Sequence, residues 1–312
     1  MKRVELGITW IGVALTMIFT NLAVNVENAN AADALKPNIV LILADDFGLD
    51  GVGCYGSDKH KTPNVDKLAA SGTRFQTCYV HGPIQGTPET KAGVTDADAF
   101  YEDNIRYMDK QVGAVVAELE KLGLREKTLI LFTADNGTAL TFPNTIGGRM
   151  INGKKASMLE GGSRVPLIAS WPGRTPSGKV SQDLISLADP YATFAELTGA
   201  KLPGNLIIDG QSFASQLHGK PGTLRDSVYV QLGKKWFVRE ANYKMNEAGE
   251  LFDMKDAPFQ EKLIQTDSDS DESKAARNRL SMTLSRLNPG AGKVDEGGLA
   301  RKNANQANRK AP

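Results

Sequence analysis

Residues 38–46, Asn-Ile-Val-Leu-Ile-Leu-Ala-Asp-Asp, constrain the fold of this chain more than any other segment. An unbroken apolar run that is rich in β-branched residues and too short for a helix is typical of a buried strand in a largely parallel sheet. The run stops at two carboxylates, Asp45 and Asp46. Because open α/β sheets bind ligands at the carboxyl ends of their strands, this segment predicts an α/β fold with a site at its end.

A second segment repeats this design, since residues 128–134 form another apolar run that leads into Asp-Asn-Gly. If both strands belong to one sheet, their polar ends meet at the same edge. Carboxylate and amide oxygens suit calcium or magnesium, and no Cys or His cluster indicates a softer metal. Either segment alone is better explained as a turn, because Asp and Asn are common turn residues. Together they predict a metal site made of four residues, namely Asp45, Asp46, Asp135 and Asn136.

The composition sets the size and excludes some partners. The chain has 312 residues, of which 41% are hydrophobic, enough for one large domain or a domain with an appendage. A net charge of +1 provides no basic field, so nucleic acid is not an expected partner. Cys54 and Cys78 are compatible with a disulfide or with two buried thiols.

The N-terminus predicts export. Lys2 and Arg3 precede an apolar segment from Leu6 to Val24, and Ala-Asn-Ala at 29–31 is a small-residue cleavage site. This pattern is typical of a secretory signal peptide over residues 1–31, and a retained membrane anchor is the alternative. Cleavage places the protein in the periplasm or outside the cell, without a stable membrane anchor.

Helical and strand patterns fill the rest of the chain. Apolar spacing predicts a long helix over 96–122, and Thr62 and Pro63 are expected as the N-cap and first residue of another helix. Three parts are expected after the signal peptide: an α/β domain over 32–224, a small antiparallel subdomain over 225–265, and a polar, largely disordered tail over 266–312. Within the tail, residues 273–287 are compatible with one helical turn or more, and disorder is expected from residue 288. Other expected strands and helices cover residues 73–80, 165–171, 189–198, 228–231 and 236–239.

The order of motifs resembles the sulfatases of the alkaline-phosphatase superfamily, in particular secreted bacterial arylsulfatase-type enzymes. The resemblance extends from Lys36 to about Leu263. The matching blocks are Pro-Asn-Ile-Val-Leu-Ile-Leu-Ala-Asp-Asp at 37–46, Thr-Pro-Asn-Val-Asp-Lys-Leu-Ala at 62–69, Tyr-Met-Asp at 107–109, Phe-Thr-Ala-Asp-Asn-Gly at 132–137, Glu-Gly-Gly-Ser-Arg-Val-Pro at 160–166, Trp-Pro-Gly at 171–173 and Glu-Leu-Phe-Asp at 250–253.

The resemblance implies a fold, an activity and site residues. The fold would be an alkaline-phosphatase-like, largely parallel sheet flanked by helices, with a small C-terminal antiparallel appendage. The activity would be calcium-dependent hydrolysis of sulfuric esters on sulfated carbohydrate or aryl sulfate, and Mg²⁺ is the less suitable ion. Lys155 and His81 match family residues that bind the substrate sulfate, although the residues alone favour a solvated surface lysine at position 155. The predicted metal residues match the calcium ligands of the family.

The family's nucleophile has no counterpart at either cysteine. Members carry a Cys or Ser in a Cys/Ser-x-Pro-x-Arg signature that is converted to formylglycine, and neither Cys54 nor Cys78 is followed by that pattern. No formylglycine is therefore expected. The chain reads as if an internal block were deleted near residues 79–81, which predicts an incomplete core and an apolar patch at 80–84.

Two functions follow from this reading. The first is a sulfatase by descent that is inactive for want of its nucleophile, and the second is a non-catalytic remnant that binds calcium or sulfated glycans. Hydrolysis of phosphoryl or phosphonate esters is disfavoured, because it usually needs more metal-binding His than the three that the chain contains.

Overall fold

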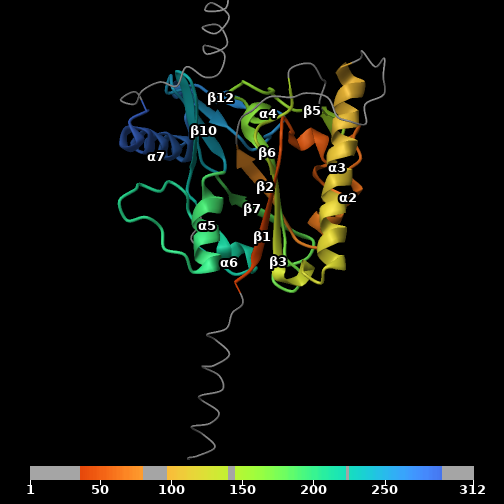
Figure 1. The fold of residues 1–312 in the computed structure, drawn as a ribbon. Helices are drawn as coiled ribbons and strands as arrows, with labels where there is room; N and C mark the ends of the chain where they lie inside the picture. Colours follow the sequence, from red (N-terminus) through yellow and green to blue (C-terminus); the bar gives the residue numbers. More distant parts are fainter. Residues whose placement is uncertain (1–35, 80–96, 140–144, 223–224, 290–312) are drawn as a thin grey trace, which may run out of the picture. The chain divides into compact units, whose positions relative to one another are not determined.

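The computed structural model describes residues 36–79, 97–139, 145–222 and 225–289 (Figure 1). The chain divides into two units, Met1–Pro37 and Asn38–Pro312, and the elements described below belong to the second. The predicted signal peptide, His81 and the predicted apolar patch at 80–84 lie outside the described residues, as does the tail from residue 290. Among the described residues, no helix has the length and apolarity that crossing a membrane requires.

Sheet A is the centre of the molecule and has five strands in the order β1-β3-β6-β2-β7. Four strands run in one direction and β6 is reversed, pairing antiparallel with both of its neighbours. The predicted α/β fold with a largely parallel sheet is therefore confirmed, with one reversed strand inside it. The strands are β1 (Asn38–Ala44), β2 (Thr73–Tyr79), β3 (Thr128–Ala134), β6 (Arg164–Ser170) and β7 (Lys179–Leu184).

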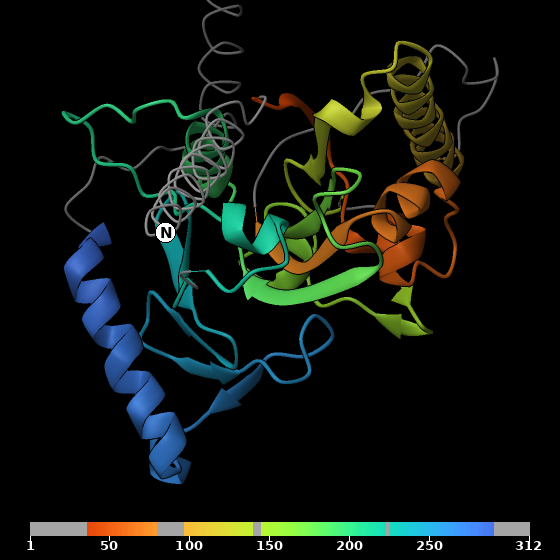
Figure 2. The ribbon, with the colours of Figure 1, turned by 90° about the horizontal axis from the view of Figure 1, so that it is seen from below.

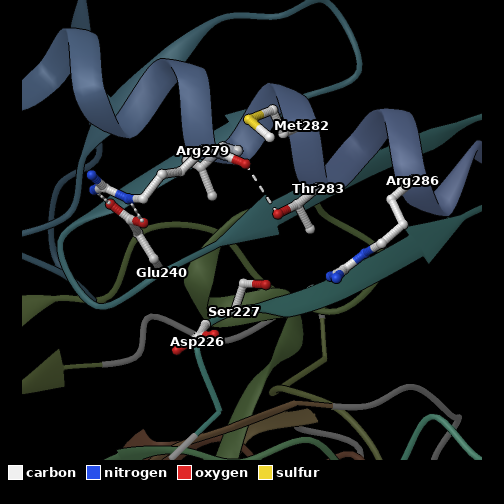
Figure 3. Close-up of a pocket in the computed structure, with 8 residues that line it drawn as sticks. Asp226, Ser227, Glu240, Arg279, Met282, Thr283 and Arg286 are labelled. Carbon is white, nitrogen blue, oxygen red and sulfur yellow. Dashed lines mark hydrogen bonds and ion pairs between the residues drawn. The ribbon is translucent and has the colours of Figure 1, made fainter.

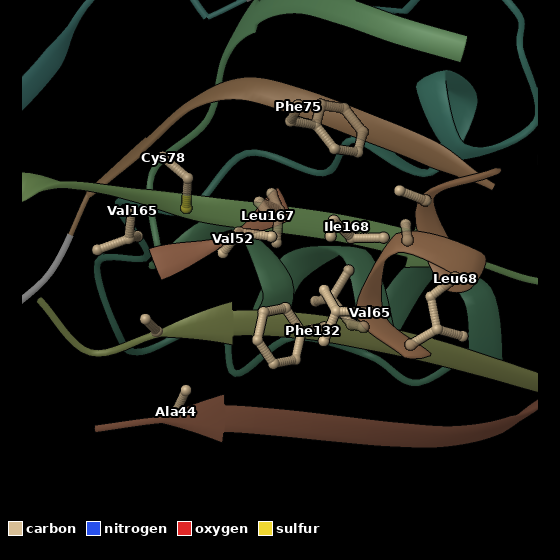
Figure 4. Close-up of a cluster of buried hydrophobic side chains, with 14 of the residues drawn as sticks. Ala44, Val52, Val65, Leu68, Phe75, Cys78, Phe132, Val165, Leu167 and Ile168 are labelled. Atoms are coloured by element: carbon tan, nitrogen blue, oxygen red, sulfur yellow. The ribbon is translucent and has the colours of Figure 1, made fainter. Parts of the chain in front are cut away.

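Helices cover both faces of sheet A (Figures 1 and 2). On one side are α2 (Pro63–Ala70) and α3 (Ala97–Lys121), and on the other are α5 (Asp189–Thr198) and α6 (Ala214–Leu217). The apolar side chains between them form one continuous core, in which Phe75, Phe132, Leu167 and Ile168 are fully buried (Figure 4). Burial on both faces explains why β3 and β6 read as unbroken apolar runs.

The start of α2 is capped from another helix rather than from its own N-cap. Thr62 makes no capping hydrogen bond to α2, and its hydroxyl instead donates to Asp66 at 3.0 Å. Asp109 on α3 accepts hydrogen bonds from the backbone N–H groups of Asn64 (3.0 Å) and Val65 (2.9 Å). A carboxylate that binds free N–H groups at a helix N-terminus is favoured by the helix dipole. The Tyr-Met-Asp block at 107–109 therefore joins α3 to α2.

Sheet C is the antiparallel appendage, with five strands in the order β12-β11-β10-β9-β8. Its strands are β8 (Val228–Leu232), β9 (Lys235–Arg239), β10 (Tyr243–Asn246), β11 (Leu251–Asp253) and β12 (Lys262–Ile264). The shorter elements of the chain are η1 (Leu49–Gly51), η2 (Gly53–Tyr55), η3 (Arg125–Lys127), β4 (Thr145–Ile146), β5 (Arg149–Met150), α4 (Glu160–Ser163) and η4 (Thr266–Ser268).

The helix α7 (Asp271–Leu287) packs on sheet C, in a region that the polar composition predicted to be largely disordered. The helix that the sequence allows over 273–287 is therefore present, and disorder does not hold for this part of the tail. Ser270 caps the helix by accepting a hydrogen bond from the backbone N–H of Ser273 at 3.2 Å. Ala276 and Leu280 are fully buried in a cluster with sheet C, and Leu284 packs beside them. One narrow apolar stripe at i, i+4 and i+8 is enough to bind the helix to a preformed sheet, although its average composition is polar.

A buried ion network connects sheet A to sheet C. Glu160 in α4 accepts from Arg164 of β6 at 3.0 Å, and Arg239 of β9 lies 3.3 Å from its other carboxylate oxygen. Lys244 of β10 pairs with Glu261, which also accepts a hydrogen bond from the backbone N–H of Glu160 at 3.0 Å. All five side chains are at most 9% exposed. Two carboxylates thus face three cations, and no negative charge in this network is left uncompensated.

Candidate metal centre

The parallel pairing of β1 with β3 brings the predicted acidic residues together. The two strands are in register from Asn38 and Thr128 to Ala44 and Ala134, so the next residues are Asp45 and Asp135. Ligand oxygens of Asp45, Asp46 and Asp135 all lie within 4.8 Å of one another, and we call these three residues the acidic cluster. The backbone holds them there, because the N–H of Asp46 donates to Asp135 Oδ1 at 2.8 Å and the N–H of Asp135 donates to the carbonyl of Ala44 at 2.9 Å.

The backbone of Asp46 has the left-handed conformation, with φ of 53°. A non-glycine residue seldom adopts this region, although Asp is among the residues that tolerate it best. The turn points the buried Asp46 carboxylate back toward Asp135, whereas a continued strand would alternate its side chains across the sheet. The local conformation is therefore part of what assembles the acidic cluster.

The electrostatics of the acidic cluster favour a bound cation. Burial, followed by the neighbouring charge of Asp135, raises the pKa of Asp45 to about 6. Burial also raises the pKa of Asp46, although hydrogen bonds from Lys155 and Asn136 counteract the shift. Calcium binds oxygens at about 2.3–2.6 Å, so two ligands on opposite sides of one ion are about 5 Å apart. The 4.8 Å spread of the carboxylate oxygens and their hard donor chemistry fit such an ion.

Asn136 reaches the acidic cluster through its nitrogen. Its Nδ2 donates to Asp46 Oδ1 at 2.6 Å and to the carbonyl of Gly137 at 3.1 Å. To act as a ligand, the amide must turn over so that its oxygen faces the carboxylates. The next residue has to be glycine, because a Cβ on Gly137 would stand 1.9 Å from the carbonyl oxygen of Gly161. This close approach packs the end of β3 against α4.

Lys155 is the cation of this site, and its Nζ forms an ion pair with Asp46 Oδ1. Its side chain is 21% exposed, and its backbone N–H donates to the carbonyl of Thr138 at 2.9 Å. The structure therefore places Lys155 against the acidic cluster and not on a solvated surface. One lysine faces three carboxylates, so the cluster keeps an excess of negative charge.

A second buried group beside the cluster was not anticipated from the sequence. The Thr138 hydroxyl lies 2.8 Å from Asp50 Oδ2, 3.0 Å from the Tyr101 hydroxyl and 3.1 Å from the backbone nitrogen of Gly48. Burial raises the pKa of Asp50 to about 6. Asp50 sits in a Gly-rich loop, and no local pattern marks it as buried. These contacts fix the loop that follows β1.

Neither cysteine has the environment of a reactive thiol. No disulfide joins Cys54 and Cys78, a pairing that the sequence left open. Burial and the neighbouring carboxylate of Asp66 raise the pKa of Cys54 to about 12. Cys78 is fully buried in the core. A thiol acts as a nucleophile only as the thiolate, which these surroundings disfavour.

One match to the family's nucleophile signature was overlooked in the sequence. Residues 170–174 read Ser-Trp-Pro-Gly-Arg, which has the Ser-x-Pro-x-Arg spacing. Ser170 pairs with Ile130 near the start of β3, whereas the acidic cluster follows the end of that strand. At about 3.3 Å per residue, five residues separate Ser170 from the cluster by roughly 17 Å. Its hydroxyl is buried against Arg125 (2.6 Å) and Ser71 (2.9 Å), so Ser170 has a structural role.

A separate hollow of about 540 Å³ lies between α7 and sheet C (Figure 3). Arg279 and Glu240 form an ion pair at 2.6 Å on its wall, and the side chains of Arg286 and Ser227 point into it (Figure 3). The hollow contains none of the residues of the acidic cluster. Its lining consists of Asp226, Ser227, Glu240, Arg279, Leu280, Met282, Thr283 and Arg286.

The fold and the acidic cluster together define an α/β protein with a group of carboxylates at the end of its central sheet. A model of the Sulfatase family matches residues 37–87 and 84–200, more than half of the chain. The chain belongs to the sulfatase family, as the motif order predicted. The match falls into two blocks that meet near residue 84, which is consistent with a chain that has lost an internal part.

Curated relatives and solved structures agree with this assignment. The chain is 37% identical over 169 residues to N-acetylgalactosamine-6-sulfatase of Canis lupus familiaris, covering 53% of this chain and 31% of the relative. It is 39% identical over 125 residues to steryl-sulfatase of Mus musculus, covering 38% of this chain and 20% of the relative. The chain thus spans a third or less of the length of these two relatives.

The solved structures show the fold alone. Ps i-CgsB superposes with a TM-score of 0.66 at 19% identity, covering 84% of this chain and 94% of that one. The same protein has been solved in complex with k-i-k-neocarrahexaose. PsFucS1 sulfatase from Pseudoalteromonas sp. superposes with a TM-score of 0.63 at 17% identity, covering 87% and 93%.

Proposed function

We propose that this chain is an exported member of the sulfatase family that binds a calcium ion and sulfate-bearing ligands without hydrolysing them. The observation that carries the proposal is the acidic cluster, in which three carboxylates meet one lysine. Asp45, Asp46 and Asp135 would hold the ion, and Asn136 would join them after its amide turns. Ca²⁺ suits this all-oxygen donor set better than Mg²⁺, which demands a stricter geometry.

The ligand is proposed to be a sulfated carbohydrate or an aryl sulfate ester. When bound, the metal supplies a positive charge that polarises a sulfate oxygen. Lys155 would donate to another oxygen of the same sulfate, because its ammonium already lies at the cluster beside Asp46. The names of the relatives, which include an N-acetylgalactosamine-6-sulfatase and a steryl-sulfatase, support a sulfate ester of this kind.

Absence of turnover is proposed because no described nucleophile reaches the cluster. Burial and the neighbouring Asp66 raise the pKa of the Cys54 thiol, Cys78 is fully buried in the core, and Ser170 lies at the opposite end of β3. Removal of a nucleophile costs on the order of 10⁶ in rate where it has been measured. The second candidate, a working sulfuric ester hydrolase, is supported by the family assignment itself.

Ligand binding and sulfate release separate the two functions. We expect a sulfated oligosaccharide to bind in the presence of Ca²⁺, with weaker binding by Lys155→Met and unchanged binding by the exposed neighbour variant Lys154→Met. We also expect no release of inorganic sulfate above a protein-free blank. Release of sulfate, together with an aldehyde found by mass spectrometry at Cys54, Cys78 or Ser170, would establish the hydrolase instead. Equal binding by wild type and Lys155→Met would remove Lys155 from the site.

A further inference from the structure

The two edge strands that sheet A shows within the described residues differ in chemistry. β7 carries the charged residues Lys179 and Asp183. Charged side chains on an edge strand are a common protection against pairing with another chain. β1 has no charged residue between Asn38 and Ala44. It therefore has the sequence of an internal strand and the position of an edge strand.

One face of β1 is also uncovered. Leu41 is 47% exposed and Leu43 is 52% exposed, whereas their β3 partners on the same face, Leu131 and Thr133, are fully buried. Ile42 and its neighbour Val40 lie on the other face and pack against the core. The helices that cover sheet A therefore stop short of β1 on one side. An apolar stripe and an open hydrogen-bonding edge lie next to each other.

We propose that β1 is the contact strand of a two-fold homodimer, in which the β1 strands of two copies of this chain pair antiparallel with Leu41 opposite Leu41. A two-fold contact uses the same surface on both copies, so the surface must be complementary to itself. An uncharged apolar strand meets that condition, and strand addition at an open edge satisfies its free backbone groups. Pairing also covers the exposed leucine of each copy with that of the other.

The charges that flank β1 select the antiparallel direction. Lys36 stands two residues before the strand and the exposed Asp45 stands one residue after it. Antiparallel pairing places the basic end of each strand beside the acidic end of the other, whereas parallel pairing places like charges together. A contact of seven residues is smaller than the roughly 800 Å² per partner of standard interfaces. The dimer is therefore expected to be weak and concentration-dependent.

Sedimentation of the full chain measures the association. Wild type is expected to shift from a 33.6 kDa monomer toward twice that mass as its concentration rises to about 100 μM, well above the roughly micromolar range of weak interfaces. Leu41→Lys introduces a charge at the two-fold axis and should remain monomeric. Ile207→Lys, at a 93% exposed apolar position in the loop before α6, should associate like wild type. A monomeric wild type, or equal association by Leu41→Lys, overturns the proposal.

Cysteine cross-linking tests the register without weakening the contact. Under mild oxidation, Leu41→Cys alone should form a disulfide-linked dimer, because residue 41 faces itself. Ile39→Cys alone should not, but a mixture of Ile39→Cys with Leu43→Cys should, because these positions face each other across the axis. Wild type, with its free and largely buried Cys54 and Cys78, provides the background. Strong cross-linking of Ile39→Cys with itself would indicate parallel pairing and contradict the proposed dimer.

Discussion

The acidic cluster and the ion network are both rich in carboxylates, but their charges are balanced in different ways. In the ion network, Glu160 and Glu261 face three protein cations and every member is buried. In the acidic cluster, Lys155 is the one cation that the described part of the chain pairs with the three carboxylates. A buried charge is tolerated when it is paired, and like charges that converge without a counter-ion repel one another. The ion network is therefore a structural joint, whereas the uncompensated charge of the acidic cluster supports the proposed binding of a cation.

The largest expected effect comes from breaking the ion network. Glu160→Gln leaves Arg164 and Arg239 without their shared negative charge, and loss of one partner of a buried pair typically costs about 3–5 kcal/mol of unfolding free energy. Glu240→Gln is the matched control, because its partner Arg279 is 56% exposed and the loss of this solvent-screened pair should cost less than about 1 kcal/mol. Urea unfolding measures both. Equal losses of unfolding free energy for the two variants would show that the ion network does not hold sheet A and sheet C together.

The next largest effect is expected at Asp50. This carboxylate differs from those of both regions, because its partner is the Thr138 hydroxyl. Its pKa is raised from 3.8 to about 6, so the folded chain binds a proton more tightly than the unfolded chain. Stability from this group is present below about pH 4 and is lost as the pH rises through 6, by about 3 kcal/mol at 1.36 kcal/mol per pKa unit. Asp50→Asn removes this slope. The difference in unfolding free energy between variant and wild type should therefore grow by about that amount from pH 4 to pH 7. Parallel stability curves would contradict the assignment.

A smaller effect is expected in the acidic cluster, and its sign is opposite to that of Glu160→Gln. With Ca²⁺ removed by a chelator, Asp135→Asn relieves the repulsion between carboxylates and should raise the unfolding free energy by up to about 1 kcal/mol, a modest value because Asp45 is exposed to screening solvent. Asn keeps the shape of the side chain and can still accept the hydrogen bond from the N–H of Asp46. Chemical unfolding in chelator gives the comparison. If Asp135→Asn lost several kcal/mol of unfolding free energy, as expected for Glu160→Gln, the carboxylates of both regions would stabilise the fold and the contrast between them would fail.

Local patterns were enough to predict the acidic cluster but not its surroundings. The apolar runs of β1 and β3 and the carboxylates that follow them are contiguous in the chain, so their meeting at one edge followed from parallel pairing. The reversal of β6 depends on the path of the chain, which no local signal encodes. That reversal is also what places Ser170, despite its matching signature, at the far end of β3.

Partners that are distant in the sequence explain the other features that local patterns did not predict. The cap of α2 comes from Asp109, 44 residues beyond the Val65 that it binds, and the carboxylate of Glu261 that holds α4 lies 101 residues after Glu160. The polar composition of α7 also did not indicate its packing. A single apolar stripe on this polar helix packs on a sheet formed by residues earlier in the chain. Such contacts depend on tertiary packing, which outweighs local propensity.

Binding of Ca²⁺ at the acidic cluster is measured by titration calorimetry. Chelator-treated wild type is expected to bind one Ca²⁺, and saturation at about 100 times the dissociation constant should stabilise the fold by about 2.7 kcal/mol. Asp135→Asn should lose both the binding heat and the stabilisation, while Glu240→Gln, which removes a carboxylate elsewhere, should keep both. Equal Ca²⁺ binding by wild type and Asp135→Asn, or none by wild type, would contradict the account.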